Sequence, residues 1–269
     1  IPNEILNNPQ LSPYLLKRDP LDRRKGVEEL SKYISTNVFV DDVLFYIRGY
    51  DIMFNRNSSF SLNTFGILNY KYDNWERDEV INTLNNIRGP IVRGAEPITI
   101  STLSTKENFI TFIFPVPIQS SNPNTVIMVL IRESTLLDLI KKTSGRYDGN
   151  IIVYDKSGGI VTSLNKVPES SIVDIMEYIN NNDNNMSTSN IISINNVKHI
   201  ISVVKPSNNN WGYISLISCD IALNDLNTLK RANMALIMVL IILECLFIIF
   251  FMKLNYNPIK ALTGFAEKI

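Results

Sequence analysis

The sequence predicts an α/β (α+β) fold in which a long N-terminal helix precedes two successive units of helices and antiparallel strands, followed by a transmembrane helix. Three observations predict it. One segment near the C-terminus is apolar over a membrane-spanning length. The region before it alternates helical patterns with short segments rich in β-branched and aromatic residues, which are typical of strands. The order of these elements in the first half recurs in shorter form in the second half.

The apolar segment runs from Ala235 to Met252 and reads ALIMVLIILECLFIIFFM. A run of about 18 or more apolar residues can cross a hydrocarbon layer of roughly 30 Å. Lys230 and Arg231 precede the run and Lys253 follows it, so the flanking charges leave its orientation open. Because no signal-peptide pattern opens the chain, we expect a further transmembrane helix upstream of residue 1 to lead the first region across the membrane.

The composition indicates a folded region with one membrane helix. Hydrophobic residues make up 45% of the chain and charged residues 19%, which is sufficient for a sizeable core. The 26 basic residues balance the 26 acidic residues, so these residues predict no nucleic-acid-binding surface; DNA binding would require a further domain. Cys219 precedes the apolar run and Cys245 lies inside it, so no disulfide framework is predicted.

The first predicted unit covers residues 36–145, after a helical stalk over residues 1–35. Asp22 to Asn37 has apolar residues at helical spacing, and Trp75 to Ile87 has a helical pattern that Gly89 and Pro90 end. A third helical segment over residues 134–144 closes the unit. The predicted strands of this unit are residues 43–49, 51–55, 58–62, 98–103, 108–118 and 125–132.

The second predicted unit covers residues 146–222 and repeats the plan. It begins with a hairpin, NIIVYDKSGGIVTSL, whose turn contains Gly158 and Gly159. A helix over Glu169 to Ile179 follows, then an exposed asparagine-rich loop and three strands at residues 190–196, 198–207 and 211–218. We expect Asp220 to Asn233 to be helical and to continue into the membrane. The predicted connecting and transmembrane helix covers residues 223–252, and a coupling helix covers residues 253–269.

The order of these segments from Asp22 to Asn233 resembles a double Cache domain, a PAS-like extracellular sensor of bacterial transmembrane receptors. The hairpin pattern formed by Asp155, Gly158, Ile160 and Ser163 carries the resemblance, together with the strand that Trp211 begins. The resemblance implies an extracellular receptor region that binds a small molecule in its first, membrane-distal unit. It also implies a bacterial cell membrane location, with residues before about 234 extracellular and residues after 252 cytoplasmic, and a homodimer.

The segment after the apolar run bears on the cytoplasmic output. Pro258 and Ile259 lie just past the membrane, and proline is tolerated in the first turn of a helix. The segment is similar to the start of a HAMP linker helix. It is equally similar to the juxtamembrane segment of Firmicutes receptors that join a double Cache domain to an AraC-type helix-turn-helix transcription regulator. We favour the transcription regulator marginally, followed by a sensor histidine kinase and then a methyl-accepting chemotaxis receptor.

The candidate ligand contacts lie in the first unit, where aromatic and arginine side chains accompany the strands. An arginine can bind a carboxylate through two parallel hydrogen bonds, and an aromatic ring can stack on a sugar or a cationic amine. The ligand is therefore expected to be a sugar, a carboxylate or an amine. The arginine-tryptophan-tyrosine cluster of amino-acid-binding double Cache receptors is not matched around Trp75, which puts amino-acid sensing in doubt. The predicted contacts are Tyr46, Arg48, Tyr70, Trp75, Arg93, Phe112 and Phe114.

The residues given predict no enzyme, no metal site and no cofactor. His199 is the only histidine, so a histidine triad or multi-histidine metal site is excluded within this chain, and we expect it to be a partly buried strand residue. Asp41 and Asp42 are interpreted as solvated loop or cap residues rather than as an acid/base pair. Asp155 is expected to cap the glycine turn. A membrane-tethered extracellular hydrolase or an adhesion module remains the alternative of a different class.

Glu244 is unusual because it places a carboxyl group in the middle of the apolar run. A charged carboxylate there costs about 2.5 kcal/mol or more, so the group is expected to be protonated or to face another helix. Two interpretations stay open: a neutral acid that a very apolar helix tolerates, and a contact with a second copy or with the expected upstream helix.

Overall fold

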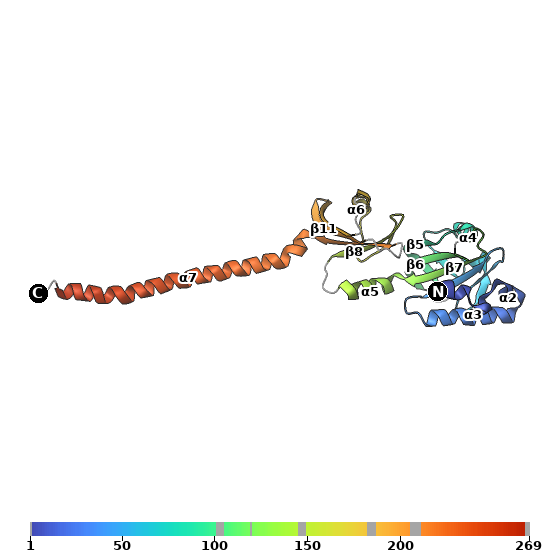
Figure 1. Ribbon diagram of the computed structural model, residues 1–269, viewed down its shortest axis with the longest axis horizontal. Helices are drawn as coiled ribbons and strands as arrows, with labels where there is room; N and C mark the ends of the chain where they lie inside the picture. The colour runs from blue at the N-terminus through green and yellow to red at the C-terminus, as the bar shows by residue number, and fades with distance from the viewer. Residues whose placement is uncertain are drawn as a thin grey trace. The chain divides into compact units, whose positions relative to one another are not determined.

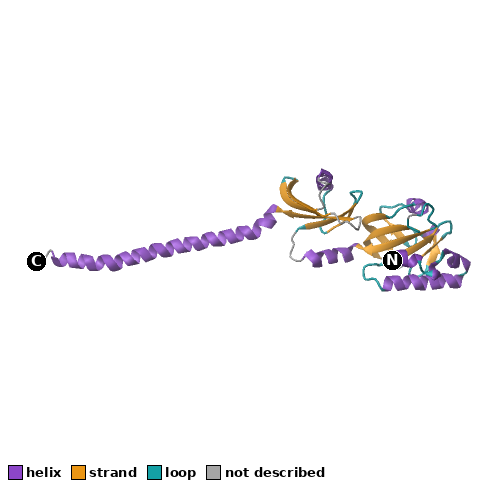
Figure 2. Ribbon diagram, viewed as in Figure 1, coloured by secondary structure: helices purple, strands orange, loops and turns teal. Residues whose placement is uncertain are grey.

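The computed structural model of the chain describes residues 2–100, 105–118, 120–144, 149–181, 187–204 and 211–266. It contains a seven-stranded and a five-stranded antiparallel sheet, each accompanied by helices, and a long C-terminal helix (Figure 1, Figure 2). The predicted α/β fold class with two sheet-containing units is confirmed. The residue boundaries predicted for these units stay a prediction.

The N-terminal region consists of several helices rather than one. The helix α3, Pro20–Ser35, corresponds to the helix predicted from Asp22. This helix and the two short helices before it each start at a proline. A proline fits the first turn of a helix, but it cannot continue a helix that precedes it. The Asp19 carboxylate accepts the backbone N–H groups of Leu21 and Asp22 at 2.8 and 3.0 Å, which caps α3. The preceding helices are α1 (Pro2–Leu6), η1 (Pro9–Leu11) and α2 (Pro13–Arg18).

The seven-stranded sheet has the strand order β3-β2-β1-β7-β6-β5-β4. Its strands are β1 (Asp42–Ile47), β2 (Ile52–Phe54), β3 (Ser59–Ser61), β4 (Tyr70–Tyr72), β5 (Ile91–Ile100), β6 (Thr105–Val116) and β7 (Thr125–Arg132). The accompanying helices are η2 (Leu62–Thr64), α4 (Arg77–Asn86) and α5 (Glu133–Ser144). Two features differ from the prediction. The strand β4 was not predicted, and β5 begins seven residues before the predicted start at Ile98. A bulge between Arg93 and Glu96 interrupts the alternation that sequence patterns detect.

The two faces of this sheet bury different helices, because successive side chains of a strand point to opposite sides. On one face, Leu30 and Ile34 of α3 pack against Phe45 of β1. On the other face, Val80 and Leu84 of α4 pack in a cluster with residues of β1, β6 and β7 (Figure 1). We call this second side the α4 face.

The five-stranded sheet has the order β10-β11-β12-β8-β9. Its strands are β8 (Asn150–Asp155), β9 (Ile160–Ser163), β10 (Ser187–Ile194), β11 (Val197–Val204) and β12 (Trp211–Ser218), and its helix is α6 (Glu169–Asn181). The predicted role of Asp155 is confirmed, since its Oδ1 atom accepts the N–H groups of Ser157 and Gly159 at 2.9 and 2.8 Å. Gly158 has a φ of 83°, as this turn requires. His199 is a half-buried residue of β11, as expected.

Some predicted segments fall outside the described residues. They are the end of the strand predicted to Leu103, most of the asparagine-rich loop, the residues around Pro206 and the last three residues of the chain.

The helix α7, Cys219–Ala266, contains the predicted transmembrane segment. Its part from Cys219 to Lys253 is long and apolar enough to cross a membrane, with a mean hydropathy of 3.0 in its most apolar window. The helix continues through Pro258, where the sequence suggested the start of a new helix. By its internal contacts the chain divides into two compact bodies, residues 1–216, which contain both sheets, and residues 217–269.

Candidate functional site

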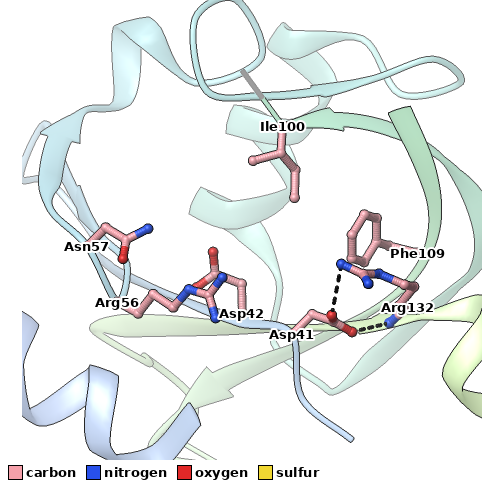
Figure 3. Close-up of a pocket in the computed structure, with 7 residues that line it drawn as sticks. All are labelled: Asp41, Asp42, Arg56, Asn57, Ile100, Phe109 and Arg132. Carbon is pink, nitrogen blue, oxygen red and sulfur yellow. Dashed lines mark hydrogen bonds and ion pairs between the residues drawn. The ribbon is translucent and has the colours of Figure 1, made fainter. Parts of the chain in front are cut away.

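A small charged hollow lies where β1 begins and where β5 and β7 end (Figure 3). Its volume is ≈ 30 Å³. A buried water needs roughly 10–15 Å³ by this measure, so the hollow has room for a group about the size of a carboxylate. The lining residues are Asp41, Asp42, Arg56, Asn57, Ile100, Phe109 and Arg132. Guanidinium and carboxyl groups thus face one another beside two apolar walls.

Asp42 is the most buried charged residue of the hollow, with 5% of its surface exposed. The interpretation of Asp42 as a solvated residue was wrong, because the first residue of β1 faces inward under the β2–β3 turn. Its Oδ1 atom accepts the N–H of Val43 at 2.9 Å, and its Oδ2 atom accepts the hydroxyl of Tyr70 at 2.5 Å. The Tyr70 hydroxyl in turn accepts the Asn55 amide at 2.8 Å. Burial raises the pKa of Asp42 and also raises the pKa of Tyr70.

The turn between β2 and β3 positions Arg56 over Asp42. The Asn55 side-chain oxygen accepts the N–H groups of Asn57 and Ser58 at 3.0 and 2.8 Å, which fixes the turn. Figure 3 shows the Arg56 guanidinium pointing toward the Asp42 carboxyl group. The positive charge of Arg56 lowers the pKa of Asp42, against the larger effect of burial. Arg56 forms no ion pair with another described residue.

The second arginine of the hollow is already neutralised. Arg132 pairs with Asp41 at 3.3 Å and with Glu107 at 2.5 Å. The backbone N–H of Arg132 donates to Asp41 at 2.7 Å, so the carboxylate holds both the side chain and the end of β7. The guanidinium also lies 5.8 Å from the centre of the Phe109 ring. Arg56 is therefore the guanidinium of the hollow that is best placed to bind an incoming anion.

The buried carboxyl group of Asp42 gives a testable dependence on pH. Its pKa is raised in the folded state, so from about pH 4 upward the folded state retains a proton that the unfolded state has lost. Stability is therefore expected to decrease as the pH rises through this window and then to level off. Urea unfolding of wild type and Asp42→Asn over a pH series measures the effect as the difference between the two curves. Parallel curves would show that Asp42 ionises normally in the folded state.

Two of the predicted ligand contacts serve internal contacts of the first unit. The hydroxyl of Tyr46 donates to Asn85 at 2.8 Å, at the end of α4. Arg48 donates to the carbonyl oxygens of Leu84 at 2.9 Å, Pro123 at 2.9 Å and Ile87. The last carbonyl groups of a helix lack hydrogen-bond donors within the helix. The Arg48 guanidinium supplies such donors at the end of α4.

Arg48→Ala is expected to lower the free energy of unfolding by about 2–4 kcal/mol, because it leaves partly buried carbonyl groups without donors. Urea unfolding of the chain in detergent, followed by the fluorescence of Trp75 and Trp211, measures this loss. Arg88→Ala is the control, since Arg88 lies in the same region without an ion pair to a described residue. A wild-type midpoint for Arg48→Ala would show that its bonds to these carbonyl groups contribute nothing.

Trp75 and Arg93 lie together at a different place, an open groove of ≈ 630 Å³ on the α4 side. Trp75 lines this groove, and the Arg93 guanidinium lies 4.2 Å from the centre of its indole ring. Arg93 also pairs with Glu96 at 2.6 Å, and Glu96 is 6% exposed. The Trp75 and Arg93 side chains thus contact each other. We call this cavity the Trp75 groove.

Phe112 and Phe114 lie on the face of the sheet opposite to α4. They are stacked on β6 with ring centres 6.3 Å apart, and they pack against the cluster that contains the α3 residues. Hence they do not share a pocket with Tyr46, Tyr70 or Trp75. Of the seven predicted contacts, Tyr70 comes nearest to the charged hollow, through its bond to Asp42. A role for the predicted residues in ligand binding stays a prediction.

Arg56 was not among the residues predicted to contact a ligand. A usable signal was present: Asp42 opens an apolar strand, and Asn55 precedes an arginine in a polar turn. Among the described residues, no group of three or more His, Cys, Asp or Glu side chains is placed to hold a metal ion.

Comparison with solved structures places this architecture among known folds. The ligand-binding domain of the amino acid chemoreceptor PctB of Pseudomonas aeruginosa PAO1, in complex with L-Arg, has a TM-score of 0.52 and 13% identity, covering 86% of this chain and 83% of that chain. The extracellular domain assigned to the histidine kinase rpHK1S-Z16 has a TM-score of 0.50 and 10% identity, covering 73% and 78%. The fold of this chain is similar to the folds of these two domains.

The domain assigned to the histidine kinase vpHK1S-Z8 is similar to the same extent, with a TM-score of 0.50, 11% identity and coverage of 80% and 84%. No protein-family model matches the chain, and no curated protein matches it. The likeness is therefore one of fold. It agrees with the predicted extracellular sensor architecture, whereas no relative named above is an AraC-type regulator.

Proposed function

We propose that this chain is the ligand-sensing region of a transmembrane signalling receptor of a bacterial cell membrane, and that a small molecule binds in the charged hollow at Asp42 and Arg56. The observation that carries the proposal is a guanidinium group that is held over a buried carboxyl group and forms no ion pair with another described residue. Arginine binds carboxylates through two parallel hydrogen bonds, so the expected ligand carries a carboxylate.

The fold supports the sensing role. Domains with this architecture belong to chemoreceptors and to proteins assigned as histidine kinases, and one of them was solved with L-Arg bound. The helix α7 has the length and apolar composition to cross a membrane. Ligand binding would favour one of two conformations of the first unit, and the shift in population would reach the output along the chain.

For the output, we propose a histidine kinase or a chemoreceptor, because proteins of these kinds carry the similar folds. The AraC-type regulator rests on sequence resemblance, chiefly in the segment around Pro258. The homodimer and the orientation, with residues before about 234 outside the cell, belong to the same proposal.

A thermal-shift panel tests the proposal. The 269-residue chain in detergent is heated with small carboxylates, amino acids, amines and sugars. A ligand at about 100 times its Kd stabilises the folded state by about 2.7 kcal/mol, which gives a clear rise in melting temperature. We expect shifts with compounds that carry a carboxylate and none with their amides or with neutral sugars. Absence of a shift with every class would contradict the proposal.

A further inference from the structure

The bulge in β5 joins the first sheet to the second. We propose that Arg93 is a positioning residue that holds this bulge in one conformation. We also propose that the contact of Gly94 with β9 makes the position of the five-stranded sheet depend on the conformation of the bulge. The proposal concerns how the two sheets are held together, so it stands beside the proposed function and requires no ligand.

Gly94 is the point of closest approach. A Cβ atom added to Gly94 would lie 2.3 Å from the backbone carbonyl oxygen of Ile160 and 3.4 Å from the Cα atom of Val161. Both neighbours belong to the backbone of β9, which cannot turn aside as a flexible side chain can. The glycine therefore allows β5 and β9 to touch directly. Any substitution at Gly94 must move β9 relative to β5.

Two hydrogen bonds and one cation–π contact of Arg93 hold the bulge in its conformation. The register of β5 against β6 shifts between Arg93 and Glu96, the two residues on either side of the contact point. These residues pair through two bonds, Nε to Oε1 at 2.6 Å and Nη2 to Oε2 at 3.2 Å. The Arg93 guanidinium also lies over Trp75 at the edge of the Trp75 groove. Since Glu96 is buried, loss of Arg93 would leave a buried carboxylate without its cation.

The apolar surface of the second sheet depends on this contact. Val153 of β8 and Val161 of β9 are buried in one cluster with Ile110 of β6 and Ile140 of α5. In the same cluster, the Trp211 ring stacks on Phe112 with the centres 5.4 Å apart. Part of one face of the five-stranded sheet, on β8, β9 and β12, is thus covered by residues of the first unit.

A polar contact strengthens the joint. Glu133, which begins α5 directly after β7, accepts the hydroxyl of Thr162 at 2.6 Å and the amide of Asn108 at 2.8 Å. Thr162 is 3% exposed. The carboxylate of Glu133 therefore bridges β6 and β9. A change in the shape of β5 is expected to reach β8, β9 and then β12, which the chain continues into α7.

Hydrogen exchange of the full chain in detergent, without ligand, tests the proposal. In Gly94→Ala, the amide groups of β8 and β9 are expected to exchange about tenfold faster or more, while those of β1 and β7 keep wild-type rates. Gly89→Ala is the control, because a Cβ atom at Gly89 meets nothing within 4 Å. Unchanged exchange of β8 and β9 in Gly94→Ala would overturn the proposal, and so would an equal increase in β1 and β7.

Arg93→Ala tests the role of Arg93 separately. It is expected to accelerate exchange in β8 and β9 as Gly94→Ala does. Arg77→Ala is the matched control, because its side chain is also 29% exposed, forms an ion pair and lines the Trp75 groove, while its hydrogen bonds go to Asp78 and Asn63 rather than to Glu96. Equal exchange in the Arg93 and Arg77 variants would overturn the role of Arg93. Failure of the proposed function would instead appear as absent thermal shifts, with these exchange rates unaffected.

Discussion

Tyr70→Phe is expected to lower the free energy of unfolding by about 2–4 kcal/mol, although it removes a single oxygen atom. The reason is the buried network that this hydroxyl connects. It donates to Asp42 and accepts from Asn55, so its removal takes one hydrogen bond from the buried Asp42 carboxyl group and one from the buried Asn55 amide group. Since Asn55 also fixes the turn that carries Arg56, the same substitution is expected to loosen the charged hollow.

Tyr72→Phe provides the control for this prediction. Tyr72 is buried in the same apolar cluster, but within the described part of the chain its hydroxyl bonds only to the neutral Thr111 side chain, at 3.1 Å. A neutral hydrogen bond contributes about 1 kcal/mol, so a smaller loss is expected. Urea unfolding followed by tryptophan fluorescence compares the two variants. Equal losses of unfolding free energy in Tyr70→Phe and Tyr72→Phe would show that the hydrogen bonds of Tyr70 to Asp42 and Asn55 contribute no more than a single neutral hydrogen bond.

Arg56→Ala is expected to weaken binding of a carboxylate ligand about 100-fold, because the hollow then lacks the guanidinium that no described residue pairs with. Stability should change little, since Arg56 is only partly buried and forms no ion pair with a described residue. Arg56→Lys should recover part of the affinity, since an ammonium group keeps the charge without the paired hydrogen bonds. Titration calorimetry with a compound from the thermal-shift panel measures these differences.

Arg24→Ala is the matched control for Arg56→Ala. Arg24 is 79% exposed and lies across a shared groove from Arg56, on α3, where it pairs with Glu28. It carries the same charge outside the hollow, so its removal should leave the dissociation constant unchanged. A loss of affinity in both variants would indicate a general electrostatic effect. Unchanged affinity in Arg56→Ala would place the ligand elsewhere.

Much of the fold could be predicted because its signals are local. The apolar run marks α7, and Asp155 with Gly158 marks the hairpin turn, since each depends on a few neighbouring residues. The helices α4 and α6 and most strands of both sheets follow from periodicity in the same way. The first half of β5 was missed because the bulge at Arg93 and the proline at position 97 hide its alternation.

The candidate site could not be predicted because it is assembled from distant segments. The start of β1, the β2–β3 turn and the end of β7 contribute Asp42, Arg56 and Arg132, and only the strand order β2-β1-β7 brings them together. Sequence patterns favour aromatic residues as ligand contacts, yet Tyr46 and Tyr70 serve internal hydrogen bonds. Neighbouring acids usually face water, which is why the burial of Asp42 went unrecognised.

The most direct test of the ligand site is an experimental structure of the chain in a lipid nanodisc with the panel compound that gives the largest thermal shift. We expect density in the hollow at Asp42, with the ligand carboxylate within hydrogen-bond distance of the Arg56 guanidinium. Density in the Trp75 groove or on the five-stranded sheet, with the hollow at Asp42 unchanged, would contradict it.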